Sequence, residues 1–261
     1  MKIEMISCDL DRTLLCSDGT ISAYTLDVLE RCRNNSILFA YATARAKSAS
    51  EPFIDETKPD IIISDGGALA RMGDEVIHRV VLPPETVDRI MRILHSGEKV
   101  GYITASTDIG LLVNYEVDPN DEAWKVWQPV YVDFMTGIDQ AHEIYKFSPE
   151  ITETWMNKEI MKLPDISYIP FHGENWCHIG SQGVSKWQGI QKAAAHLGID
   201  TKNIVAFGDD YSDIEMLQGC GIGVAVANAI DEVKAVADFV CESNDNDGVA
   251  KWLEENLCKS R

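Results

Sequence analysis

The feature that most constrains this chain is a set of short, almost uniformly apolar segments that alternate with stretches of helical periodicity. Such segments span residues 3–8, 37–42 and 61–63, and the same rhythm returns near the C-terminus at 203–207 and 222–226. Strands that are apolar on both faces are typical of a parallel sheet covered by helices on both sides. The pattern therefore predicts an α/β fold whose core is a Rossmann-like, doubly wound parallel sheet.

The middle of the chain breaks this rhythm, because its apolar residues come in shorter and more alternating runs. We interpret residues 83–182 as an inserted α/β domain, and residues 1–82 and 183–261 as the two parts of the core that close around it. A chain of 261 residues is long enough to bury a sizeable core and to carry such an insertion.

Local signals locate several helices and one hairpin. Ser22 is expected to cap a helix that runs to about residue 34. The segments Ser185-x-x-Gln188 and Ser212-x-x-Glu215 both match a capping box, so helices are expected after Ser185 and from Asp213 onward. Two alternating runs on either side of a turn predict a β-hairpin next to the core, at residues 68–71 and 75–81.

Charge and cysteine content narrow the class of protein. A net charge of -19 argues against nucleic acid or an anionic membrane as a partner, because both repel an acidic surface. The seven cysteines are scattered and form no C-x-x-C pair, which is typical of reduced proteins. With neither a signal-peptide pattern nor an apolar run of membrane-spanning length, a cytoplasmic protein is expected. Composition does not predict the oligomeric state.

Two acidic motifs follow two of the expected strands. Asp9 and Asp11 are two apart in a segment taken as extended, so their side chains can point the same way. Asp209 and Asp213 follow a later strand, and ligands of parallel sheets bind beyond the carboxyl ends of the strands. Four carboxylates brought together repel one another unless a cation joins them. Ligation by carboxylate oxygens favours Mg²⁺ over zinc or copper.

On these residues the chain resembles the haloacid dehalogenase (HAD) superfamily, and within it the Cof-like subfamily IIB with a C2-type cap. The resemblance covers essentially the whole length. It rests on four motifs in order, namely the D-x-D-x-T pattern at residues 9–13, Thr43 after the second strand, Lys186 after Ser185, and the G-D-x-x-x-D pattern at residues 208–213.

The resemblance implies a role for each of these residues. Asp9 resembles the nucleophile that forms an aspartyl-phosphate. Asp11 resembles the general acid that protonates the leaving oxygen and then the base that activates water. Thr43 and the backbone near Ala44 are expected to hold the phosphoryl oxygens, and Lys186 to add a positive charge at a helix N-terminus.

The resemblance also implies Mg²⁺ as the cofactor. Its expected ligands are Asp9, the backbone carbonyl of Asp11 and Asp209, with Asp213 close by or acting through water.

The implied function is a Mg²⁺-dependent phosphatase that hydrolyses a small phosphorylated metabolite, with sugar phosphates as the first class to consider. An inserted cap favours a small substrate, because a lid obstructs a polymer from reaching Asp9. Two alternatives stay open. One is a sugar-phosphate mutase that uses the same aspartyl-phosphate, and the other is a non-catalytic protein that binds phosphate or Mg²⁺.

Two positions depart from the subfamily, which has glycine where Arg12 and Ala44 stand. Arg12 either leans outward and pairs with a surface acid or acts as a cation at the mouth of the site. Arg45 is expected near the site without a definite role. A metal site at His172, Cys177 and His178 is not favoured, because no second ligand pair completes it. The aromatic residues of the cap are interpreted as its core, namely Trp124, Trp127, Tyr131 and Phe134.

Overall fold

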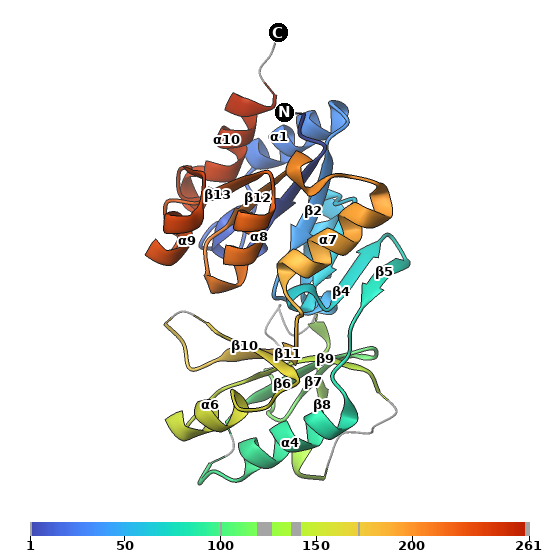
Figure 1. Cartoon of the computed structure of the whole chain (residues 1–261), viewed down its shortest axis with the longest axis vertical. Coiled ribbons are helices and arrows are strands. Elements are labelled where there is room, and N and C mark those ends of the chain that lie inside the picture. The colour runs from blue at the N-terminus through green and yellow to red at the C-terminus, as the bar shows by residue number, and fades with distance from the viewer. Residues whose placement is uncertain (1, 100, 119–126, 137–141, 172, 259–261) are drawn as a thin grey trace.

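The computed structural model describes residues 2–99, 101–118, 127–136, 142–171 and 173–258. These residues form two structural units, here called layers, and each has its own sheet and helices (Figure 1). The upper layer in Figure 1 contains both ends of the chain, and the lower layer contains its middle.

The core sheet has eight strands in the order β14-β13-β12-β1-β2-β3-β4-β5. The strands from β14 to β3 pair in parallel, whereas β4 and β5 continue the sheet as an antiparallel hairpin. Both the parallel core and the hairpin are thus confirmed. The strands are β1 (Met5–Cys8), β2 (Leu38–Ala42), β3 (Ile61–Ser64), β4 (Leu69–Met72), β5 (Glu75–Arg79), β12 (Ile204–Gly208), β13 (Ile222–Ala225) and β14 (Phe239–Val240).

Helices cover this sheet, and the order of its strands explains how. The chain moves in one direction from β1 through α1 to β2, and in the opposite direction from β12 through α8 to β13. Because such crossovers are right-handed, α1 and α8 lie on opposite faces. The strand order reverses between β1 and β12, and ligands bind at this reversal in sheets of this kind. The core helices are α1 (Ala23–Asn34), α2 (Lys47–Ser50), α3 (Ile54–Thr57), α7 (Lys186–Leu197), α8 (Ile214–Gly219), α9 (Asp231–Val236) and α10 (Gly248–Asn256).

The second sheet has the order β10-β11-β9-β6-β7-β8, and its members lie within residues 83–182, which we propose as the cap domain. One face packs on α4 and α6 through an apolar cluster that includes Ile90, Phe147 and Ile179. The other face looks toward the core (Figure 1). The elements are α4 (Pro84–His95), β6 (Ile103–Thr107), β7 (Gly110–Val113), β8 (Val130–Tyr131), β9 (Ile144–Pro149), α6 (Thr154–Ile160), β10 (Ile166–Pro170) and β11 (Cys177–Ser181).

Short helical turns connect several of the described elements. They are η1 (Leu10–Leu14), η2 (Glu51–Phe53), η3 (Asp65–Gly67), η4 (Phe134–Thr136), η5 (Thr201–Asn203), η6 (Tyr211–Asp213) and η7 (Asn244–Asn246). Over the described part of the chain, every helix is too short or too polar to cross a membrane.

Two of the three predicted helix caps are confirmed. The Ser22 hydroxyl accepts the N–H of Thr25 at 3.0 Å, and α1 follows. The Ser185 hydroxyl accepts the N–H of Gln188 at 3.3 Å, so Lys186 is the first residue of α7.

The third predicted cap is wrong, because Asp210 rather than Ser212 caps the turn before α8. The Asp210 carboxylate accepts the N–H of Tyr211 at 2.8 Å, and the Asp213 carboxylate accepts the N–H of Asp210 at 3.1 Å. Each of these two aspartates therefore accepts a backbone N–H of the other in the turn before α8. The Asp213 carboxylate also accepts the N–H of Asp209, so it points back toward the end of β12.

A close backbone contact seats the start of α7 on the core. Gly67 has a φ of +107°, and a Cβ on it would lie 1.9 Å from the carbonyl oxygen of Ser185. Only a glycine allows the chain to pass this close, so the position of Lys186 depends on Gly67.

A second close contact joins the two layers. His178 of β11 packs on Gly66 of the core, where a Cβ would lie 2.5 Å from the imidazole Cε1. Burial, followed by the positive charges of Lys146 and Lys186, lowers the pKa of His178 to about 3. The imidazole is therefore neutral at ordinary pH.

We expect Gly67→Ala to lower the free energy of unfolding by about 2–4 kcal/mol, because it adds both a left-handed strain and an overlap with Ser185. Gly73→Ala is the matched control, since Gly73 also has a positive φ, +59°, but nothing lies within 4 Å of its Cβ position. Its expected cost is only about 1 kcal/mol. Urea denaturation measures both, and equal costs would contradict the packing argument.

We expect acid to destabilise the protein through His178. Below its ordinary pKa of 6.5 the unfolded chain takes up a proton that the folded chain does not, so stability is lost as pH falls from about 6.5 toward 3. The free energy of unfolding of the wild type relative to His178→Gln should fall by roughly 2 kcal/mol between pH 7 and pH 5. The exposed His196→Gln serves as the control for loss of an imidazole. A difference that does not change with pH would refute the assignment.

Candidate active site

The candidate site lies at the reversal of strand order. Asp9 follows β1, Thr43 follows β2 and Asp209 follows β12, and β1 is hydrogen-bonded to both of the other strands. Lys186 enters from the first turn of α7, and Asp213 from the turn before α8. All five side chains are buried. The structure thus brings together five of the residues that the sequence singled out.

The Lys186 ammonium is the centre of this group. It donates one hydrogen bond of 2.6 Å to Asp9 Oδ1 and another of 2.6 Å to Asp213 Oδ1. Burial alone would lower the pKa of Lys186, but the charges of Asp213 and Asp9 outweigh it and raise that pKa above its ordinary value. Lys186 therefore stays positively charged inside the protein.

The carboxylates around Lys186 are buried close to one another, and this disfavours their charged forms. Burial is the main cause that raises the pKa of Asp9 well above its ordinary value, although Lys186 opposes it. Burial, followed by the charge of Asp213, raises the pKa of Asp209 to about 7, while the Thr13 hydroxyl donates to Asp209 Oδ1 at 3.1 Å and lowers it. One lysine does not neutralise three buried carboxylates.

This donor set fits a divalent cation. One carboxylate oxygen from each of Asp9, Asp209 and Asp213 lies within 4.8 Å of the others. All three donors are hard oxygen atoms, which Mg²⁺ prefers. A cation among them would offset the burial, and after it the mutual repulsion, that raise the pKa values of Asp9 and Asp209.

The D-x-D segment is extended at both of its aspartates, and both line the same cavity, although the segment as a whole is not a continuous strand. The chain turns into η1 directly after Asp9, and the Asp11 side chain is exposed. Arg45 holds it with two hydrogen bonds, from Nη2 to Oδ1 at 2.6 Å and from Nε to Oδ2 at 2.8 Å. Arg45, which the sequence left without a role, is therefore the partner of Asp11.

Arg12 has a left-handed backbone, with a φ of 59°, which costs an arginine roughly 1–2 kcal/mol relative to glycine. The side-chain amide of Asn228 donates to its carbonyl oxygen at 2.7 Å and fixes this turn. Arg12 is exposed and is one of the residues that line the cavity above the carboxylates.

A cavity of about 370 Å³, here called the reaction cavity, opens above these groups. The core provides most of its wall, and the cap closes it with two side chains from the segment after β10. Its lining residues are Asp9, Asp11, Arg12, Ala44, Phe171, Glu174, Lys186, Asp209, Asp210 and Ser212. Thr43 lies beside it and accepts the N–H of Arg45 at 3.1 Å through its hydroxyl.

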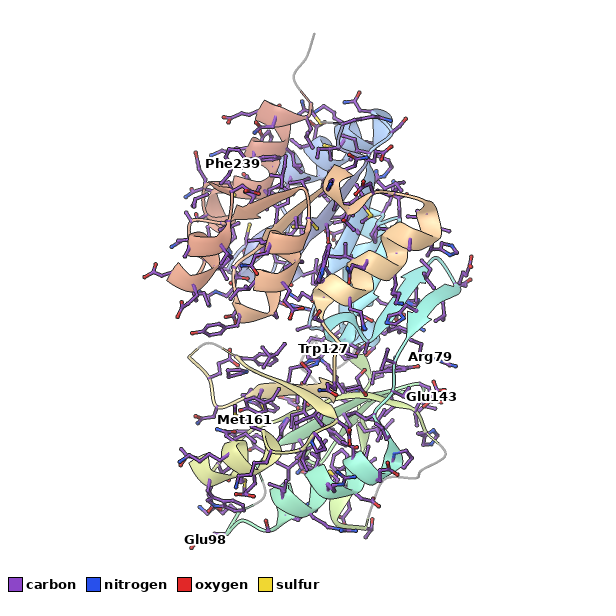
Figure 2. All side chains as sticks on the ribbon, in the orientation of Figure 1. Arg79, Glu98, Trp127, Glu143, Met161 and Phe239 are labelled. Carbon is purple, nitrogen blue, oxygen red and sulfur yellow. The ribbon has the colours of Figure 1, made fainter. Side chains whose placement is uncertain are left out.

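A second cavity of about 390 Å³, here called the side chamber, adjoins the first. The two share Asp11, Ala44, Phe171 and Glu174. Figure 2 shows Trp127 where cap and core meet, and this side chain lines the side chamber. The remaining lining residues are Arg45, Ala46, Ala49, Thr104, Ser106, Leu111, Lys146, Ser148 and Trp176.

Sequence reasoning missed the cap residues Lys146, Ser148 and Glu174. A signal was present, since polar residues recur at every second position of β6 and β9, as Thr104 with Ser106 and as Lys146 with Ser148. In a strand with an apolar opposite face, this alternation indicates a face turned toward something polar.

The interpretation of the cap aromatics as core is confirmed for Phe134, which is buried. It is wrong for Tyr131, which is 62% exposed on the edge strand β8. Trp127 packs on an apolar cluster that includes Ala46 and Ala49 of the core. Trp124 lies outside the described residues.

The two described residues of the possible metal site do not point into a common space. Cys177 and His178 are adjacent in β11, so their side chains point to opposite faces of the sheet. His172 lies outside the described residues.

Comparison with known proteins agrees with this geometry. Residues 6–253 match the family of haloacid dehalogenase-like hydrolases. The chain is 29% identical to the 5-amino-6-(5-phospho-D-ribitylamino)uracil phosphatase YwtE of Bacillus subtilis, over 98% of each protein. Among solved structures, it is similar to the phosphatase BT1666 of Bacteroides thetaiotaomicron, with 27% identity, a TM-score of 0.83, and coverage of 97% of this chain and 95% of the other. The sugar phosphatase BT4131 of HAD subclass IIB has 25% identity and a TM-score of 0.83, covering 97% and 98%.

Proposed function

The chain belongs to the haloacid dehalogenase-like hydrolases and is an enzyme of the phosphatase class, and we propose that it hydrolyses a small phosphorylated metabolite through an aspartyl-phosphate on Asp9, with Mg²⁺ as the cofactor. The observation that carries this proposal is the buried Lys186 ammonium, which holds Asp9 beside Asp209 and Asp213 at the base of a closed-over cavity. A carboxylate, a cation and a cavity that admits a small anion are the parts that phosphoryl transfer needs.

In the first step a carboxylate oxygen of Asp9 attacks phosphorus, and the bond from phosphorus to the leaving oxygen breaks. Lys186 donates to Asp9 Oδ1, so Oδ2 carries the lone pair that is free to attack. The ammonium also fixes the rotation of the carboxylate, because its second hydrogen bond ties it to Asp213.

Asp11 supplies the proton that the leaving oxygen needs. Its carboxyl lines both the reaction cavity and the side chamber, at the boundary where the leaving oxygen would lie. In the second step Asp11 takes a proton from water as the water oxygen attacks phosphorus, and the bond to Asp9 breaks to release phosphate. Arg45 orients Asp11 through two hydrogen bonds.

The remaining charges act on the phosphoryl oxygens. Thr43 and the adjacent backbone lie at the end of β2, and Lys186 contributes its positive charge from the N-terminus of α7. A Mg²⁺ ion held by Asp9, Asp209 and Asp213, with the backbone carbonyl of Asp11, would supply charge neutralisation for the transferring group.

A sugar or polyol phosphate is the substrate class that we propose. Related proteins carry the names of a sugar phosphatase and of a phosphatase for a ribityl phosphate. The side chamber, with a volume of about 390 Å³, offers room for a leaving group of that size.

We expect wild-type enzyme to release inorganic phosphate from a panel of sugar and polyol phosphates with Mg²⁺ but not with EDTA. Asp9→Asn should lower kcat at least about 1,000-fold, because the nucleophile is lost. The exposed Asp27→Asn is the control for loss of a carboxylate. Full activity of Asp9→Asn would remove the nucleophile assignment.

Other outcomes of the same assay would point to other functions. Formation of an isomerised sugar phosphate in place of free phosphate would indicate a mutase. Calorimetric binding of Mg²⁺ and ligand without any turnover would indicate a binding protein.

We expect Asp11→Asn to separate the two chemical steps. With p-nitrophenyl phosphate the leaving group departs without a proton, so the variant should give a rapid burst of one equivalent of nitrophenol. Steady turnover should then be roughly 100–10,000-fold slower than in wild type, because no base activates water. Intact mass after the burst should show one added phosphoryl group. Steady-state turnover equal to that of wild type would contradict the role of Asp11.

A further inference from the structure

Two buried thiols that are far apart in the sequence meet in the core. The sulfur atoms of Cys32, in α1, and Cys258, shortly after α10, lie 2.8 Å apart. The two residues are 1% and 6% exposed. A disulfide bond is about 2.05 Å long, so the two sulfurs are within about an ångström of bonding distance. Of the hydrogen bonds between described residues, this is the only one that joins two cysteines.

Hydrogen bonds between α1 and α10 hold the two helices in a fixed alignment. Glu254 of α10 accepts one hydrogen bond of 2.6 Å from the Tyr24 hydroxyl and one of 2.5 Å from the Arg31 guanidinium, and both donors belong to α1. Beyond the end of α10, the N–H of Cys258 donates to the carbonyl oxygen of Leu253 at 3.1 Å. The folded protein therefore presents the two sulfurs to each other at a high effective concentration.

This pair of thiols lies at the edge of the core that is remote from the candidate active site. The N–H of Ile37, directly before β2, donates to the carbonyl oxygen of Cys32 at 3.2 Å, so Cys32 lies near the amino end of that strand. Asp9, Thr43 and Asp209 instead follow the carboxyl ends of their strands. Figure 1 shows the C-terminal end of α10 on the side of the core that points away from the second sheet. A bond between the sulfurs would therefore leave the reaction cavity open.

The two thiols differ in how well the fold covers them. Burial, followed by the hydrogen bond with Cys258, raises the pKa of the Cys32 thiol well above its ordinary value. Because the thiolate is the reactive form, Cys32 by itself reacts slowly with oxidants. Cys258 lies beyond the last residue of α10, and the end turns of helices open more readily than their middles. Opening of this turn would expose Cys258 to a small oxidant while Cys32 stays covered.

We propose that Cys32 and Cys258 form a modification site, at which a peroxide converts the two thiols to one disulfide bond. The Cys258 sulfur attacks one oxygen of hydrogen peroxide, the O–O bond breaks, and a sulfenic acid and water form. The Cys32 sulfur then attacks the Cys258 sulfur, and the sulfenic hydroxyl leaves with the Cys32 proton as a second water. Together the two thiols give two electrons and two protons to the peroxide.

The disulfide would join the two parts of the core. Residues 1–82 and 183–261 build one sheet, although the inserted segment separates them in the sequence. A link between Cys32 and Cys258 spans 226 positions. Closing so long a loop restricts the unfolded chain far more than the folded one, and so stabilises the fold. Asp9 and Asp209, which come from different parts of the core, would then stay together under conditions that unfold the reduced protein.

The test is to treat the fully reduced protein with hydrogen peroxide. We expect a protease digest kept free of reductant to contain a pair of peptides that are linked through Cys32 and Cys258 and lack two hydrogens. The midpoint of thermal unfolding should rise by about 5–10 °C, because the link limits the unfolded chain. Dithiothreitol should separate the peptides and remove the rise.

Cysteine variants show which thiols are responsible. Cys32→Ala and Cys258→Ala should each abolish the rise, whereas Cys220→Ala, which removes another buried thiol of the same apolar cluster, should keep it. For each variant the peroxide-treated sample is compared with the same sample after dithiothreitol. Any effect of the substitution itself on stability therefore cancels.

Two results would overturn the proposal. One is a digest without the linked peptides, whether Cys258 remains a thiol or carries added oxygen atoms. The other is a rise in the midpoint that dithiothreitol reverses and that persists in Cys32→Ala. Neither readout depends on hydrolysis of a phosphate ester, so a failure here is distinguishable from a failure of the proposed function.

Discussion

The structure depends on one buried cation. The Lys186 ammonium lies between Asp9 and Asp213, 2.6 Å from an oxygen of each, in a protein whose net charge is already -19. Removing one partner of such a buried pair leaves an uncompensated charge, which is strongly destabilising. Much of the surrounding architecture serves to hold this lysine. Ser185 caps its helix, Gly67 lets that helix approach the sheet, and the turn before α8 directs Asp213 toward it.

The parts of the site that could be predicted from the sequence are those with local signals. Asp9 and Asp209 directly follow apolar strands, and Lys186 directly follows a capping serine, so each position can be assigned from its own neighbours. The cap at α8 was assigned wrongly for a physical reason. Ser212 matches the local pattern, but the backbone N–H groups of the strand end and the Lys186 ammonium draw the Asp213 carboxylate inward, and that requirement comes from the tertiary structure.

The side chamber could not be predicted in the same way. Lys146 and Ser148 lie on one strand and Trp127 on another segment, and no motif links them. They become neighbours only through the register of β6 against β9 and through the contact between cap and core. The alternation along β9 predicts which face is polar, but not that this face looks onto the carboxylates. Arg45 illustrates the same limit, because its pairing with Asp11 depends on the unexpected turn η1.

The strained backbone of Arg12 has a consequence for how an anion approaches an acidic protein. Salt at physiological strength screens exposed charges beyond roughly 8 Å, so most of the negative surface is hidden from a phosphate ester in solution. Charges that line the reaction cavity are partly buried, so salt screens them less. There the ester meets a wall that includes Arg12, whose backbone is left-handed, and the buried Lys186. Attraction is confined to the last few ångströms of the approach, and the rest of the surface can stay acidic.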